Sequence, residues 1–160
     1  MPNHICNIVK FKGNSEVVKH LMGKIAGTEE EQIGETIGLG TIDFNKIIPE
    51  PQYKDDDEWY KWRIEHWGTK WNAYEQKKSD KSNELYFWTA WRTPLKVFQA
   101  IAKKFPSIAI EVNYADEDTG NNCGTLIFEK GELVAELKTE YSDYSRKFAK
   151  KVWKKYDTLD

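Results

Sequence analysis

The stretch "LYFWTAWRTPLKVFQAIAKKFPSIAIEVNYA", residues 85–115, contains the pattern of a strand, a helix and a second strand in one run. It begins with seven residues rich in aromatic side chains, which is typical of a strand. Thr93 and Pro94 are residue types that begin helices, and the apolar residues after them recur with a helical period. They are Val97, Phe98, Ile101, Ala102 and Phe105. From residue 107 apolar and polar residues alternate, as in a strand with one buried face.

A similar unit lies about eighty residues earlier in the chain. The strand-like run "HICNIVKFK" (4–12) is followed by turn residues and by a helical apolar face with the same offsets as the later one. That face consists of Val17, Val18, Leu21, Met22 and Ile25. The run "TIDFNKIIP" (41–49) then takes the place of the second strand.

Two strand–helix–strand units favour the split βαβ arrangement. The sequence therefore predicts an α+β fold, a ferredoxin-like split βαβ sandwich with a four-stranded antiparallel sheet and two helices on one face. The predicted strands are residues 5–12, 41–48, 85–91 and 108–115. We expect the first and third of them at the centre of the sheet.

The rest of the chain adds to this core, and we expect a single domain over residues 1–160. Residues 50–83 form a large insertion between the two units. Residues 123–157 are predicted to form a hairpin that turns at Lys130–Gly131 and a final amphipathic helix over residues 141–157. The apolar side of that helix is expected to dock on the domain. It carries Tyr141, Phe148, Val152 and Tyr156.

Composition narrows the class of protein. The chain has 160 residues, a net charge of −2 and a pI of about 6.0, so no overall positive field draws it to nucleic acid or to anionic membranes. No apolar run has the length of a membrane span, and no signal-peptide pattern precedes the first strand. These features predict a cytoplasmic protein without a membrane partner.

Four stretches together carry a resemblance to a known family. They are "MPNHICN" (1–7), "DFNKIIPEP" (43–51), "WRIEHWGTKW" (62–71) and "TAWRTP" (89–94). In these stretches the chain resembles the YubB-type ferredoxin-like family, small uncharacterised proteins of plasmids and phages. The resemblance runs from residue 1 to about residue 124 and implies a ferredoxin-like fold and a mobile-element origin. It implies no activity and no catalytic residues.

The insertion holds four tryptophans within residues 59–71. The acidic run before Trp59 suits a helix N-terminus, and Gly68 suits a helix end. We expect this helix to cover the sheet face that the two repeat helices leave open, with Trp67 and Trp71 holding the insertion on the sheet. An alternative is a ligand site at the edge of the helix. The candidate binding residues are Arg63, His66, Trp67, Thr69, Lys70 and Trp71.

Other chemistry has weak support. His4, Cys6, Cys123 and His66 lack the usual spacing of zinc ligands. The oxygen-rich run 116–122 departs from a calcium loop at the positions of its glycine and its bidentate glutamate, so a turn is favoured. No nucleophile motif or phosphate-binding loop occurs. We therefore predict no metal, no cofactor and no catalytic residue.

The final helix carries six cations without an intervening acid, from Arg146 to Lys155. A solvated outer face is one interpretation. The other is nucleic-acid contact, with Lys147, Lys151 and Lys154 as candidate phosphate ligands.

The sequence as a whole favours a non-catalytic binding module, and the resemblance to the YubB-type family implies that it is of mobile-element type. Its partner is unknown, and a host protein and a nucleic acid are both open. The alternative is an enzyme or a small-ligand-binding protein that uses Arg63 and His66 beside the Trp-rich helix.

Overall fold

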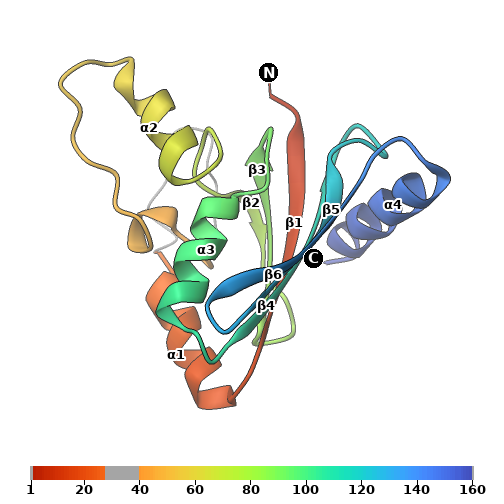
Figure 1. Ribbon diagram of the computed structural model, residues 1–160, viewed down its shortest axis with the longest axis horizontal. Helices are drawn as coiled ribbons and strands as arrows, with labels where there is room; N and C mark the ends of the chain where they lie inside the picture. Colours follow the sequence, from red (N-terminus) through yellow and green to blue (C-terminus); the bar gives the residue numbers. More distant parts are fainter. Residues whose placement is uncertain (1, 28–39, 160) are drawn as a thin grey trace.

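The computed structural model describes residues 2–27 and 40–159. Their strands form one six-stranded antiparallel sheet with the order β2-β3-β1-β4-β5-β6 (Figure 1). The strands are β1 (His4–Lys12), β2 (Tyr74–Lys77), β3 (Glu84–Ala90), β4 (Ala109–Asp116), β5 (Cys123–Glu129) and β6 (Glu132–Thr139). The helices are α1 (Ser15–Ile25), the short 3-10 helix η1 (Phe44–Lys46), α2 (Glu58–His66), α3 (Leu95–Lys104) and α4 (Asp143–Asp157).

The sheet is covered on both faces. Helices α1 and α3 pack on one face, where Val9, Phe87 and Val112 lie in the main core. Helix α4 lies on the other side of the sheet in Figure 1. Its residues Val152 and Tyr156 form a second apolar cluster with strand residues of that face. The alternation of side chains along β1, β3 and β4 sends neighbouring residues into different clusters.

The prediction of one antiparallel sheet is confirmed, but the four-strand, two-helix layout is wrong. Strand β1 is central as predicted, whereas β3 lies next to the edge strand β2 and β4 takes the other central place. Residues 41–48 contain η1 and no strand. The side-chain oxygens of Asp43 and Asn72 accept hydrogen bonds from the amides of Asn45 and Phe44, and these bonds replace strand pairing. Strand β2, in the insertion, takes the edge position next to β3 instead, and β5 and β6 extend the sheet beyond β4.

The prediction that the Trp-rich helix covers the open sheet face is also wrong. That face is covered by α4, whose buried residues recur with a helical period at Ser145, Ala149, Val152 and Tyr156. Helix α2 has no fully buried residue. The segment around it instead reaches the main core through Trp67 and, in part, Trp62.

The C-terminal hairpin and helix form close to where the sequence predicts them. Lys130 and Gly131, at the turn of the hairpin, both have positive φ angles of 52° and 81°, as hairpin turns favour. Helix α4 begins at Asp143, two residues later than predicted. The reason is a capping box, in which Ser142 and Ser145 exchange side-chain and backbone hydrogen bonds.

The end of α4 is tied to the edge strand β2. Lys77 of β2 donates hydrogen bonds from Nζ to the carbonyls of Tyr156 and Leu159, both at 3.0 Å. The Tyr156 hydroxyl in turn donates to the carbonyl of Glu75 at 2.6 Å. Within the described residues, no helix has the length and apolar character to cross a bilayer.

Candidate functional site

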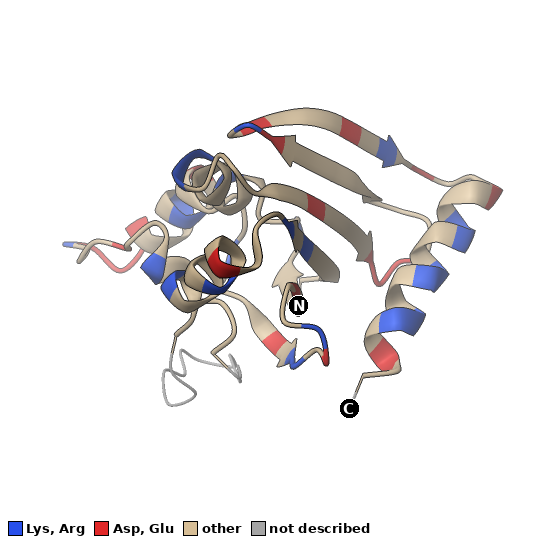
Figure 2. Cartoon of the chain, turned by 90° about the horizontal axis from the view of Figure 1, so that it is seen from below, with Lys and Arg blue, Asp and Glu red and all other residues tan. Residues whose placement is uncertain are grey.

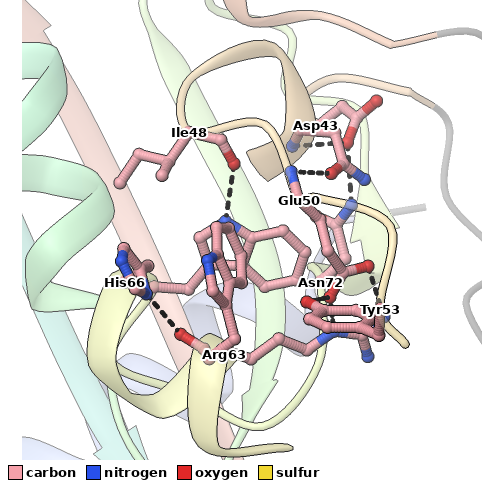
Figure 3. A network of polar contacts seen from close by, with 10 residues as sticks. Asp43, Ile48, Glu50, Tyr53, Arg63, His66 and Asn72 are labelled. Atoms are coloured by element: carbon pink, nitrogen blue, oxygen red, sulfur yellow. Dashed lines mark hydrogen bonds and ion pairs between the residues drawn. The ribbon is translucent and has the colours of Figure 1, made fainter. Parts of the chain in front are cut away.

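Arg63 of α2 forms a bidentate ion pair with Glu50 (Figure 3). The distances are 2.5 Å from Nε to Oε2 and 2.9 Å from Nη2 to Oε1. The Tyr53 hydroxyl also donates to Oε2 of Glu50, at 2.8 Å. Burial acts to raise the pKa of Glu50, but the hydrogen bonds from Arg63 and Tyr53 and the charge of Arg63 outweigh it and lower the pKa.

The guanidinium of Arg63 also lies between two indole rings. Its Cζ is 5.0 Å from the ring centroid of Trp59 and 5.2 Å from that of Trp67. Trp67 is fully buried, and its Nε1 donates to the carbonyl of Ile48 at 3.0 Å. These contacts of Arg63 fasten α2 to the segment that follows η1.

His66 lies on the same helix but does not join the Arg63–Glu50 pair. Its Nδ1 is 2.8 Å from the carbonyl of Trp62, and its ring stacks on the Trp62 ring at 4.4 Å between centroids. The side chain is exposed. The sequence predicts Arg63 and His66 at one edge of the helix, but in the structure the two side chains have separate surroundings.

Trp67 and Thr69 attach the insertion to the sheet. Both are buried, and the Thr69 hydroxyl donates to the carbonyl of Ala90 at the end of β3, at 2.6 Å. Gly68, between them, has a φ of +81°, which a glycine adopts without strain where the helix ends.

Lys70 and Trp71 lie at the surface beside the end of β3. The ammonium of Lys70 is 4.8 Å from the ring centroids of both Trp71 and Trp91. The Trp71 ring contacts Tyr74 at 5.9 Å between centroids. Lys70 thus connects the candidate residue Trp71 to Trp91, for which the sequence predicts a place in a strand.

Trp91 is the residue that sequence reasoning missed. The alternation along 85–91 predicts that its side chain points the same way as Phe87 and Thr89. Strand β3 instead ends at Ala90, and Trp91 has a φ of +66° and is 39% exposed. Its N–H donates to the carbonyl of Asn3, and its carbonyl accepts from Nδ2 of Asn122. These partners are distant in sequence, so no local signal could have indicated the change of direction.

Trp91 belongs to a series of aromatic side chains that we call the aromatic belt. Its members are Trp59, Tyr60, Trp91, Trp71, Tyr74, Trp88 and Trp153. Successive ring centroids are 5.4–6.2 Å apart, except that Lys70 bridges Trp91 and Trp71. The belt runs from α2, past the ends of β3 and β2, to α4.

Helix α4 presents its cations to solvent. Figure 2 shows its Lys and Arg residues on the side turned away from the sheet. Arg146 is 3.5 Å from Asp143, and Lys155 is 3.9 Å from the buried Glu84. Among the described residues, no ion pair engages the four other cations of the helix. They are Lys147, Lys150, Lys151 and Lys154, all exposed.

An open pocket of about 490 Å³ lies beside α4 where the belt reaches it. Trp153 and two cations, Lys150 and Lys154, line it together with the carboxylates Glu117 and Asp157. Nε1 of Trp153 donates to the carbonyl of Asp116 at 3.0 Å, which fixes the ring. The pocket therefore has mixed charge.

The part of the chain that the structure describes holds no group of three metal-ligating side chains. Cys6 and Cys123 are buried free thiols, and burial raises the pKa of both. In the run 116–122, Asp116 accepts hydrogen bonds from Nδ2 of Asn3 and the amide of Asp118, as in a turn.

Residues 70–155, more than half of the chain, match the family model described as the ferredoxin-like domain in Api92-like protein. The chain belongs to this Api92-like family. The matched region of the Api92-like domain includes β5, β6 and most of α4, which the resemblance to the YubB-type family did not cover. It leaves out β1, α1 and α2.

A crystal structure of the protein api92 from Yersinia pseudotuberculosis is similar to this Api92-like chain, with 16% sequence identity and a TM-score of 0.48. The similarity covers 62% of this chain and 39% of the other. This chain thus spans well under half of the length of that Api92. No curated protein matches the chain.

Proposed function

We propose that this Api92-like protein is a non-catalytic module that binds nucleic acid through the outer face of α4. The observation that carries the proposal is the division of α4 into two sides. One side, Ser145, Ala149, Val152 and Tyr156, is buried on the sheet. The cations occupy the opposite side and are exposed. A polyanion is the partner that complements such a face.

The spacing of the cations suits a phosphate backbone. Residues three or four apart on a helix lie on one side, so Lys147, Lys151 and Lys154 share one side of α4 and extend over about 10 Å along its axis. Phosphates follow each other at about 3.4 Å along the axis of a strand in the helical form it has in a duplex, and they lie further apart in an extended strand. The three lysines can therefore each contact a separate phosphate of one strand. Because the chain as a whole has a net charge of −2, binding would depend on this local face.

The contacts of α2 speak against the alternative function, an enzyme or a small-ligand-binding protein that uses Arg63 and His66. Arg63 already has a carboxylate partner and two aromatic rings, so it lacks the free charge that an anionic substrate would need. This favours binding over catalysis. A phage or plasmid setting, a cytoplasmic location and a host-protein partner remain predictions from the sequence.

The experiment replaces Lys147, Lys151 and Lys154 with Glu and measures binding of labelled DNA and RNA by fluorescence anisotropy, between about 50 and 200 mM salt. Each lost phosphate contact changes the slope of log K against log salt by about 0.7 to 0.9, so the triple variant should lose about 2 to 3 from its slope. The matched control replaces the exposed lysines Lys19, Lys24 and Lys103 with Glu, which changes the net charge equally.

In the control variant the slope should stay close to that of the unchanged protein, although the overall affinity falls slightly. If the two triple variants bind alike, the face of α4 is not the binding surface. If the unchanged protein shows no salt-dependent binding of any nucleic acid, the proposal is wrong.

A further inference from the structure

We infer that the nucleic acid bound is single-stranded, and that unpaired bases stack on the exposed end of the aromatic belt, at Trp91 and Tyr60. This inference rests on the proposed function, because the same strand would have its phosphates on α4. The inference adds two points to the proposed function: the class of nucleic acid, and a second contact region that includes no residue of the α4 face.

The first support is the exposure of two adjoining rings. Tyr60 is 41% exposed and Trp91 is 39% exposed, and their ring centroids are 6.2 Å apart. The belt behind them is more buried, with Tyr74 only 5% exposed. Exposed rings that are held in place by buried neighbours suit stacking by nucleic-acid bases, since every base has a π-face whatever the sequence.

The second support is the backbone at Trp91. A φ of +66° is unusual for a bulky residue and persists only where surrounding contacts enforce it. Here the backbone bonds to Asn3 and Asn122 enforce it. If residue 91 continued the strand, its ring would point to the buried side with Phe87 and Thr89. The strained conformation therefore places the ring at the surface.

The third support is the charge beside these rings. The ammonium of Lys70 lies 4.8 Å from the Trp91 ring, and Arg92, the next residue in the chain, is exposed. Proteins that bind single strands without sequence preference combine such aromatic platforms with cations that contact the backbone. In a duplex the bases stack on each other, so their faces are not available to Trp91 or Tyr60.

The fourth support is the continuity of the belt with α4. From Trp71 the rings lead through Tyr74 and Trp88 to Trp153, which is itself a residue of α4. One strand can therefore contact Trp91 at one end of the belt and the lysines of α4 at the other. The carboxylate of Glu117 lies in the pocket beside Trp153, so removing this charge should strengthen binding of a strand that follows this path.

The test compares a labelled single strand of about 20 nucleotides with a duplex of the same length, by anisotropy at fixed salt. The variants are Trp91→Ala, Tyr60→Ala and the conservative Trp91→Phe, with Tyr141→Ala as a control on another exposed ring, 60% exposed. Because these rings are at the surface, the variants should fold, and circular dichroism melts would verify it.

The unchanged protein should bind the single strand more tightly than the duplex. Trp91→Ala should weaken single-strand binding by about 5-fold to 100-fold, the usual range for one stacked base, and leave duplex binding and the salt slope unchanged. Trp91→Phe should restore most of the loss. Glu117→Gln should bind the single strand more tightly, and Tyr141→Ala should bind as the unchanged protein does.

Equal affinity for both forms, or an equal loss on both in Trp91→Ala, would overturn this inference and leave the α4 proposal standing. If the unchanged protein shows no salt-dependent binding of any nucleic acid, the proposed function is wrong, and the single-strand inference is wrong with it. The two failures are thus distinguished by the duplex measurements.

Discussion

Replacing Trp67 with Ala should remove the main attachment of α2 to the core. The ring is fully buried and contacts Phe44 at 5.6 Å and Trp62 at 5.5 Å between centroids. It also carries the stacked guanidinium of Arg63 and donates a hydrogen bond to Ile48. Large-to-small changes of a buried aromatic residue cost about 3–5 kcal/mol, because transfer energy is lost and a cavity remains.

We expect Trp67→Ala to lower the free energy of unfolding by an amount in that range. The carbonyl of Ile48 adds little, because Ile48 is only half-buried and water can replace the indole donor. Domains of this kind have a total stability of about 5–15 kcal/mol, so the variant would lose a large part of it. Trp67→Phe keeps most of the buried ring and leaves only a small cavity, so it should cost about 1–2 kcal/mol.

The assay is urea unfolding followed by far-UV circular dichroism, which does not depend on the tryptophan that is removed. Trp71→Ala is the matched control. Trp71 is only half-buried and contacts Tyr74 and Lys70 at the surface, so its loss should be less than half that of Trp67. Two results would refute the assignment of Trp67 as the anchor. One is a free energy of unfolding of Trp67→Ala within about 1 kcal/mol of that of the unchanged protein, and the other is a larger loss of this free energy in Trp71→Ala than in Trp67→Ala.

Three further predictions concern other parts of the chain. The pKa of Glu50 is lowered in the folded state, so its ion pair with Arg63 stabilises the fold above the unfolded pKa, and this contribution is lost as the pH falls through the folded pKa. Glu50→Gln should therefore melt at a lower temperature than the unchanged protein at neutral pH, and melting curves should show this difference shrinking below about pH 4. Ser142→Ala removes the cap of α4 and should cost about 1 kcal/mol in urea unfolding, with Thr158→Ala, at the other end of the helix, as a milder control. A Cβ at Gly124 would collide with the backbone carbonyl of Leu137, so Gly124→Ala should lower the melting temperature and increase hydrogen exchange in β5 and β6. An unchanged exchange pattern would contradict the observed strand register.

Local periodicity was sufficient to predict β1, α1, β3, α3, β4 and the C-terminal hairpin and helix. The helices have strong patterns because each buries one face, and β1 and β3, which are buried on both faces, stand out as short apolar runs. The segment 41–48 also has an apolar, strand-like composition, but a long-range hydrogen bond from the amide of Phe44 to the side-chain oxygen of Asn72 holds it as η1. Strand β2, "YEQK", is short and polar, and its place at the sheet edge depends on contacts with β3 and α4.

The candidate site was predictable only in part. The sequence located the aromatic segment and the anchor role expected of Trp67, which is fully buried. It could not separate Arg63 from His66, because the partner of Arg63, Glu50, is thirteen residues away in a stretch with no regular pattern. It also could not indicate Trp91, whose direction is set by Asn3 and Asn122 from opposite parts of the chain.

The bonds between Lys77 and the end of α4 have a consequence for how the chain folds during synthesis. Strand β2 has four residues and an irregular register with β3, so on its own it is the weakest strand of the sheet. Its cover and the acceptors for Lys77 come from α4, which follows every other element in the chain. A ribosome-bound chain that lacks α4 would therefore expose Tyr86 and Trp88 and hold β2 loosely, and the final helix would close the second face and the sheet edge in a single step.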